Sequence, residues 1–273
     1  MAVSVSPDLN SVIRQLGLAG RRLSDLGAAE GASGNVSVCL REPPDVSPMF
    51  SRMHTVELPL SVQELAGAVL IITGSGCRLR EIMDEPVANL ACIAVEEDGH
   101  TGRMFTSPDC RFTRVTSEFN SHLAVHHDRM QLHDIRLHTV LHAQPLYLTF
   151  LSHIPLYQDE RYLNAHLLRW QPETILNMPE GIGVLPFILP DSPAQMTGTV
   201  ESMRDHRVVV WSRHGILARS DDSVLHALDL IEYAETAARY EYLNLAAGHL
   251  SEGLSPEELR AISDAWNVRQ NIF

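Results

Sequence analysis

Residues 68–76 read AVLIITGSG, a short apolar run that ends in a turn of glycine and serine. The run is rich in β-branched residues and bounded by turn residues, which favours a strand buried on both faces. Similar patterns predict further strands at residues 36–40, 90–95, 137–144 and 207–218. Because segments of helical periodicity separate these strands, the chain is expected to form an α/β fold with helices on both faces of one sheet.

Helical segments are predicted from the spacing of apolar residues and from capping residues. They start near residues 8, 117, 159, 192, 223 and 255. The last one has serine at its cap, proline at its first position and glutamate at its third. Residues 174–186 are expected to form two short strands, or a strand and a turn, and the strand at 207–218 is expected to bend at Gly215.

The composition limits the kinds of partner. The 273 residues are 45% hydrophobic and carry a formal net charge of −13, with no basic run, which argues against a nucleic-acid partner. No apolar stretch of eighteen residues is present, and residues 1–8 lack the basic and apolar regions of a leader. We therefore expect a cytoplasmic protein with no membrane partner, and interpret residues 1–273 as one domain.

One carboxylate and two imidazoles lie at the edges of predicted elements. Glu118 follows Val-Thr-Ser at a predicted helix start, His142 lies in a predicted strand, and His214 precedes Gly215. Such a set suits a catalytic metal, which takes about three protein ligands and leaves a position open. Gln144 lies on the same strand face as His142, roughly 6.6 Å along the strand. Its amide oxygen binds zinc more weakly than an imidazole, so Gln144 is either a ligand or a sign that the metal has been lost.

Two turns combine glycine with hydroxyl or amide side chains. They are SGNVSV at residues 33–38 and TGSG at residues 73–76. Glycine lets backbone N–H groups approach an anion, and hydroxyl or amide groups complete its shell without lysine. The two segments therefore predict either a phosphate site or ordinary turn chemistry.

The order of these motifs, with VTSE at 115–118, His142 and RHG at 213–215, resembles the class II aldolase/adducin family. The spacing is most similar to that of its rhamnulose-1-phosphate aldolase branch. The resemblance implies a single-domain, three-layer αβα sandwich of class II aldolase/adducin type and a homotetramer. This chain departs from the pattern at one place, because the first two zinc histidines of the family form His-x-His and here the second is Gln144.

The resemblance also implies roles for individual residues. Glu118 would be the catalytic acid/base and would bind the metal before substrate arrives. Glu173 would donate a proton in the active site of a neighbouring subunit. One zinc or other divalent ion per subunit would be held by His142 and His214, with Gln144 as the third position. The substrate phosphate would be bound by Asn35, Ser75, Gly76, Thr116 and Ser117.

On this basis the chain is expected to be a metal-dependent aldehyde-lyase that cleaves a ketose 1-phosphate, similar to rhamnulose 1-phosphate, to dihydroxyacetone phosphate and an aldehyde. Two alternatives stay open: a sugar-phosphate epimerase or decarboxylase using the same site, and a non-catalytic binding protein like adducin that has lost the metal. Taken alone, Glu118 is equally compatible with a carboxylate favoured at a helix start. Glu173 is equally compatible with a solvated charge at a strand edge.

Overall fold

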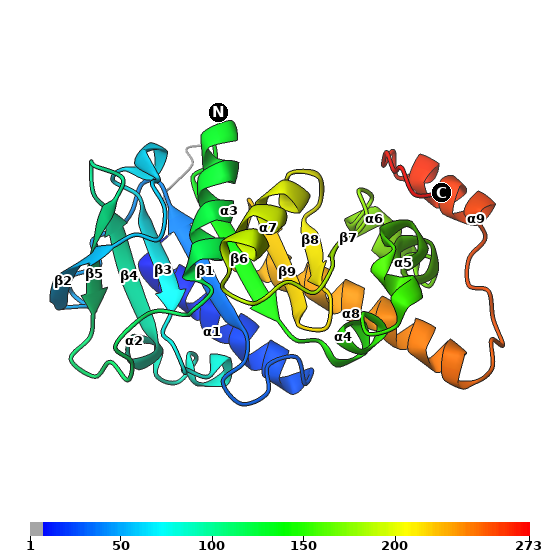
Figure 1. Cartoon of the computed structure of the whole chain (residues 1–273), viewed down its shortest axis with the longest axis horizontal. Helices are drawn as coiled ribbons and strands as arrows, with labels where there is room; N and C mark the ends of the chain where they lie inside the picture. Colours follow the sequence, from blue (N-terminus) through cyan, green and yellow to red (C-terminus); the bar gives the residue numbers. More distant parts are fainter. Residues whose placement is uncertain (1–7) are drawn as a thin grey trace.

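The computed structural model describes residues 8–273, and its strands form one nine-stranded sheet (Figure 1). The strand order is β2-β5-β4-β3-β1-β6-β9-β8-β7. Neighbouring strands are antiparallel except for the pair β7 and β8. The strands are β1 (Asn35–Leu40), β2 (Arg52–Glu57), β3 (Val69–Thr73), β4 (Leu90–Val95), β5 (Thr101–Thr106), β6 (Leu137–Ala143), β7 (Gly183–Leu185), β8 (Val208–Trp211) and β9 (Gly215–Ser220).

Helices cover both faces of this sheet. The α-helices are α1 (Leu9–Asp25), α2 (Pro86–Asn89), α3 (Phe119–Leu132), α4 (Leu146–Leu151), α5 (Glu160–Leu167), α6 (Pro172–Asn177), α7 (Pro193–Asp205), α8 (Val224–Ala246) and α9 (Pro256–Ala265), and the 3-10 helices are η1 (Gln63–Leu65), η2 (Leu79–Glu81) and η3 (Pro155–Gln158). In β8, Val208 and Val210 pack into the core with α1 and α8, whereas Val209 and Trp211 pack against α3 and α7. The α/β class and the layer of helices on each face are therefore confirmed.

The C-terminal half differs from the sequence prediction in two places. Residues 207–218 are a hairpin of β8 and β9, not one bent strand, because the chain reverses at residues 212–214 with Arg213 in the left-handed conformation (φ 65). Residues 172–177 form α6, with Pro172 in its first turn, so that part of the segment predicted as strand is helical. The remaining part does contain the short strand β7.

The sequence patterns missed β2 and β5. These strands pair at one end of the sheet, where β2 is the edge strand and is largely exposed. The exposed edge strand β2 needs no apolar alternation, and in β5 the buried positions include Gly102 and Thr106, so neither strand shows the apolar alternation that marks a strand in sequence. Within the described part of the chain, no helix combines the length and the apolar character needed to span a bilayer.

Candidate active site

A cavity of about 160 Å³ lies where the ends of β1, β3 and β6 meet the start of α3 and the β8–β9 turn. The structure brings together in its lining nine of the residues predicted from the sequence, which are Asn35, Ser75, Gly76, Thr116, Ser117, Glu118, His142, Gln144 and His214. Segments that are remote in sequence meet here because β1 pairs with both β3 and β6. Asn35 thereby lies directly opposite His142 across the two strands.

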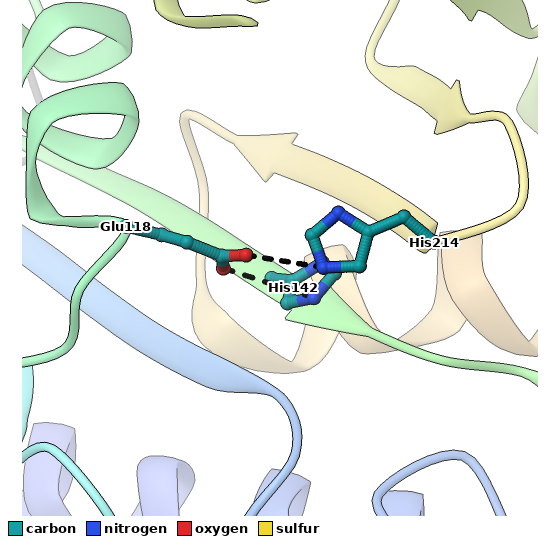
Figure 2. A group of neighbouring side chains, drawn as sticks. All are labelled: Glu118, His142 and His214. Carbon is teal, nitrogen blue, oxygen red and sulfur yellow. Dashed lines mark ion pairs between the residues drawn. The ribbon is translucent and has the colours of Figure 1, made fainter. Parts of the chain in front are cut away.

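Glu118 and the two histidines form the centre of the cavity. Figure 2 shows the carboxylate of Glu118, at the start of α3, facing both imidazoles. Its Oε1 lies 3.3 Å from His214 Nε2, and its Oε2 lies 3.7 Å from His142 Nε2. One ligand atom from each of the three residues falls within 4.8 Å of the others, so the three side chains can converge on one ion. Glu118 and His142 are buried, and His214 is partly exposed toward the cavity.

The β8–β9 turn holds His214 in place. Gly215 follows it, and a Cβ atom at that position would lie 2.4 Å from the Ala143 carbonyl oxygen and 3.0 Å from His142 Cε1. Only glycine therefore lets the turn approach β6 closely enough for both imidazoles to share one space. Trp211 stacks against His214 with ring centroids 5.3 Å apart and also contacts His142 at 4.9 Å. These contacts fix both rings before any ligand arrives.

Hydrogen bonds to the far ring nitrogens orient the two imidazoles. His142 Nδ1 lies 3.0 Å from the Ile216 carbonyl oxygen, to which it donates its proton, so Nε2 is the ring nitrogen that points toward Glu118. His214 Nδ1 faces the amide of Gln195 at 3.4 Å. The oxygen of that amide already accepts the Asp191 N–H, at 2.9 Å. Gln195 had no distinguishing sequence signal, and only its place in α7 next to the turn reveals its role.

The charge state of Glu118 is set by its burial and by its polar neighbours. Burial alone would raise its pKa, but His142, the hydrogen bond from Asn35 and His214 together outweigh burial and lower the pKa below its usual value. The Asn35 bond is short, with Nδ2 donating to Oε2 at 2.7 Å. Burial, reinforced by His142, lowers the pKa of the His214 imidazole. At neutral pH the site therefore contains an ionised Glu118 carboxylate next to a neutral His214 imidazole that can act as a ligand.

This donor set fits a divalent cation. It offers one carboxylate and two imidazoles, and His142 points its Nε2 toward Glu118. Gln144 lies just beyond the end of β6, where its backbone N–H donates to the Ala28 carbonyl oxygen at 2.8 Å and its side chain lines the cavity. It is thus placed on the same side as His142, as the strand alternation predicted.

The other end of the cavity is lined by small polar residues. Gly76 has φ +77, and Ser33 has a buried hydroxyl without a hydrogen-bond partner among the described residues. The backbone N–H groups of Ser75 and Thr116 are bonded to the Arg114 and Thr73 carbonyl oxygens, whereas those of Gly76 and Ser117 donate no hydrogen bond within the described residues. Hydroxyl groups and these two backbone N–H groups are therefore the donors available at this end of the cavity. Ser33 belongs to the quoted turn motif, yet it was not predicted to line the site.

Ser117 has a neighbour that sequence reasoning did not identify. Its hydroxyl hydrogen-bonds the carboxyl group of Asp191, and burial raises the pKa of that carboxyl group. Asp191 precedes α7 in the left-handed conformation (φ 63), and Asn120 Nδ2 donates to its carbonyl oxygen at 2.9 Å. A carboxyl group therefore stands at the rim of the cavity.

Glu173 is the one predicted site residue that lies elsewhere. It is an exposed residue in the first turn of α6, not at a strand edge, and it does not line the cavity of its own chain. The resemblance assigned it to the site of a neighbouring subunit, so its role stays a prediction.

Comparison with known proteins identifies the class to which this fold and site belong. Residues 14–242 match the family described as the class II aldolase and adducin N-terminal domain, and the chain belongs to that family. The chain is 26% identical to a rhamnulose-1-phosphate aldolase of Listeria monocytogenes serotype 4a (strain HCC23) over 264 residues, covering 94% of this chain and 93% of that protein. It is 28% identical to the rhamnulose-1-phosphate aldolase of Yersinia pestis (strain Pestoides F) over 251 residues, covering 89% and 88%.

A solved structure shows the same arrangement of elements. The sugar-phosphate aldolase from Thermotoga maritima superposes with a TM-score of 0.76 at 26% identity, covering 90% of this chain and 99% of that one. The family and the fold class predicted from the sequence motifs are therefore confirmed.

Proposed function

We propose that this protein is a metal-dependent lyase that cleaves a ketose 1-phosphate, of the rhamnulose 1-phosphate kind, to dihydroxyacetone phosphate and an aldehyde. The observation that carries the proposal is the convergence of Glu118, His142 and His214 next to a recess lined by hydroxyl groups. The rhamnulose-1-phosphate aldolases that align with most of the chain also support the proposal. We further propose one zinc ion per subunit and a homotetramer.

The ionised Glu118 is the group that transfers the proton at carbon. In the direction of condensation, its carboxylate removes a proton from C3 of dihydroxyacetone phosphate, and the resulting carbanion attacks the aldehyde carbon. Glu173 of a neighbouring subunit then donates a proton to the aldehyde oxygen, and in cleavage both proton transfers run in reverse. His142 and His214 would hold a divalent cation, which when bound would supply Lewis-acid stabilisation of negative charge on the substrate. Asn35 holds Glu118 through its amide N–H.

Metal content and activity together test this proposal. Purified protein is stripped with a chelator and titrated calorimetrically with zinc or manganese, and His142→Ala is treated identically. We expect one cation per chain in the wild type, weaker binding in the variant, and release of dihydroxyacetone phosphate from rhamnulose 1-phosphate only after metal is restored. Release that is unchanged by chelation would contradict metal dependence, and absence of any bound cation would remove the lyase proposal.

Gln144 supports a second candidate function, that of a non-catalytic binding protein of adducin type. An amide in place of an imidazole weakens a zinc site, and it is the one ligand position at which this chain departs from the resembled pattern. Wild-type protein that binds metal but never exchanges a C3 proton of dihydroxyacetone phosphate with solvent deuterium would support this candidate over the lyase.

The hydroxyl-lined end of the cavity predicts selectivity for a phosphorylated sugar. The sites proposed for the phosphate are Asn35, Ser75, Gly76, Thr116 and Ser117, with Ser33 added by the structure. Charge-assisted hydrogen bonds are about twice as strong as neutral ones, so we expect a ketose 1-phosphate to bind at least about tenfold more tightly than the free ketose. Calorimetry with both compounds measures this difference. Equal affinities would show that the recess is ordinary turn structure.

A further inference from the structure

A chain of buried polar side chains connects α3 to the sheet beneath it. Ser37 Oγ on β1 lies 2.7 Å from His122 Nδ1 and 2.7 Å from His126 Nε2, both on α3. His126 Nδ1 in turn lies 2.8 Å from His138 Nδ1 on β6. All four side chains are fully buried. None of them lines the cavity, and the proposed reaction uses none of them, although Ser37 belongs to the SGNVSV segment at residues 33–38.

This polar chain is continuous with the residues that hold Glu118. Ser37 follows Asn35 by two residues on β1, so both side chains leave the same face of the sheet. Asn35 bonds Glu118 at the start of α3, and Ser37 bonds His122 one turn further along the same helix. Both ends of the first turn of α3 are therefore hydrogen-bonded to the same strand, β1.

The three imidazoles are neutral, which gives the chain one direction. Burial lowers the pKa of His122 to about 3 and lowers the pKa of His126 and His138 well below the usual value. Each neutral ring has one donor and one acceptor nitrogen. His122 Nε2 and His138 Nε2, at the two ends of the chain, are both buried without a hydrogen-bond partner among the described residues, so one end is an unpaired acceptor and the other an unpaired N–H.

Hydrogen bonds then run from His122 through Ser37 and His126 to His138. His122 Nδ1–H donates to Ser37 Oγ, Ser37 donates to His126 Nε2, and His126 Nδ1–H donates to His138 Nδ1. In this direction the unpaired N–H is that of His138 Nε2, which lies 3.8 Å from the Asp221 Oδ1 carboxylate oxygen. Because each bond is directional, the chain permits one position of α3 along the strands, whereas apolar contacts alone tolerate sliding.

We infer that Ser37, with His122 and His126, is a positioning element that sets the Glu118 carboxylate against Asn35 and the two metal-site histidines. The expected change in kcat rests on the proposed lyase function. The expected movement of Glu118 away from Asn35 does not depend on that function. Removing the Ser37 hydroxyl leaves two ring nitrogens without their common partner and frees the first turn of α3 to shift away from Asn35.

The chain offers a matched control for this experiment. Ser121 also lies on α3 and is fully buried, but its hydroxyl has no hydrogen-bond partner within residues 8–273. Ser37→Ala and Ser121→Ala thus remove the same atom from equally buried positions. At saturating zinc we expect Ser37→Ala to lower kcat by about ten- to a hundredfold with KM changed less than twofold, since a displacement of about 1 Å has that effect, and Ser121→Ala to leave both constants unchanged.

Crystal structures of the two variants separate this inference from the proposed function. In Ser37→Ala we expect the Asn35 to Glu118 contact, 2.7 Å in the wild type, to lengthen or break, and in Ser121→Ala to persist. If the wild type proves inactive but Glu118 moves in Ser37→Ala, the positioning role stands and the lyase proposal falls. An unmoved Glu118 with unchanged kcat overturns the inference. His126→Gln, expected to act in the same direction, replaces Ser37→Ala if that variant does not fold.

Discussion

Glu118→Gln should lower the rate of dihydroxyacetone phosphate release by about 10²- to 10⁴-fold, the usual contribution of a positioned acid or base. The fold should persist because the amide is nearly isosteric with the carboxylate. Its oxygen can still accept the hydrogen bond from Asn35 at the Oε2 position, and its NH2 group then takes the place of Oε1, which lies 3.3 Å from His214 Nε2. The measurement follows product release at saturating zinc, together with exchange of the C3 proton of dihydroxyacetone phosphate with solvent deuterium.

Proton exchange makes this test independent of the unknown aldehyde. Glu64→Gln serves as the control, since Glu64 is exposed and contacts His127 away from the cavity. It should leave exchange unchanged. Exchange that survives in Glu118→Gln would show that another group is the base.

Gln144→His should increase the affinity for zinc at least tenfold, because an imidazole is a better zinc ligand than an amide. Changing one well-placed group at a metal site alters metal affinity by about 10- to 100-fold. The residue lines the cavity on the side of His142, so an imidazole there would complete the His-x-His pair of the resembled family. Zinc affinity is measured by competition with a chromogenic chelator.

A histidine introduced at an exposed position outside the cavity serves as the control for nonspecific zinc binding. Gln131→His places an imidazole on the exposed side of α3, outside the cavity, and should not change the affinity of the site. If Gln144→His binds zinc no more tightly than the wild type, position 144 does not face the ion. Activity in Gln144→His but not in the wild type would identify the amide as the change that removed catalysis.

Local patterns were sufficient for most of the framework. The apolar run at residues 68–76 forms β3 and its glycine turn, and the capping pattern at Ser255 forms α9 with both bonds of its capping box. These signals are readable because strand alternation, helix capping and glycine turns depend on neighbours a few residues away. The edge strand β2 lacked them, since solvent exposure imposes no pattern on its side chains.

The candidate site was predicted only as far as chemistry and motif order allow. Glu118, His142 and His214 were selected as residue types suited to a metal, and the structure places them within 4.8 Å of one another. Gln195 and Asp191 were missed. Both act through contacts with residues far away in the chain, and nothing in their immediate sequence distinguishes them.

The sequence by itself determined the positions of most strands and helices, the residues able to bind a metal, and the family. Tertiary structure decided which of these residues meet. Asn35 reaches Glu118 across 83 residues because β1 is inserted between β3 and β6, and His142 meets His214 because Gly215 allows the β8–β9 turn to approach β6. Strand order follows from packing the whole core and not from any local pattern, and for that reason the contacts around Ser37 and Glu118 appear only in the folded chain.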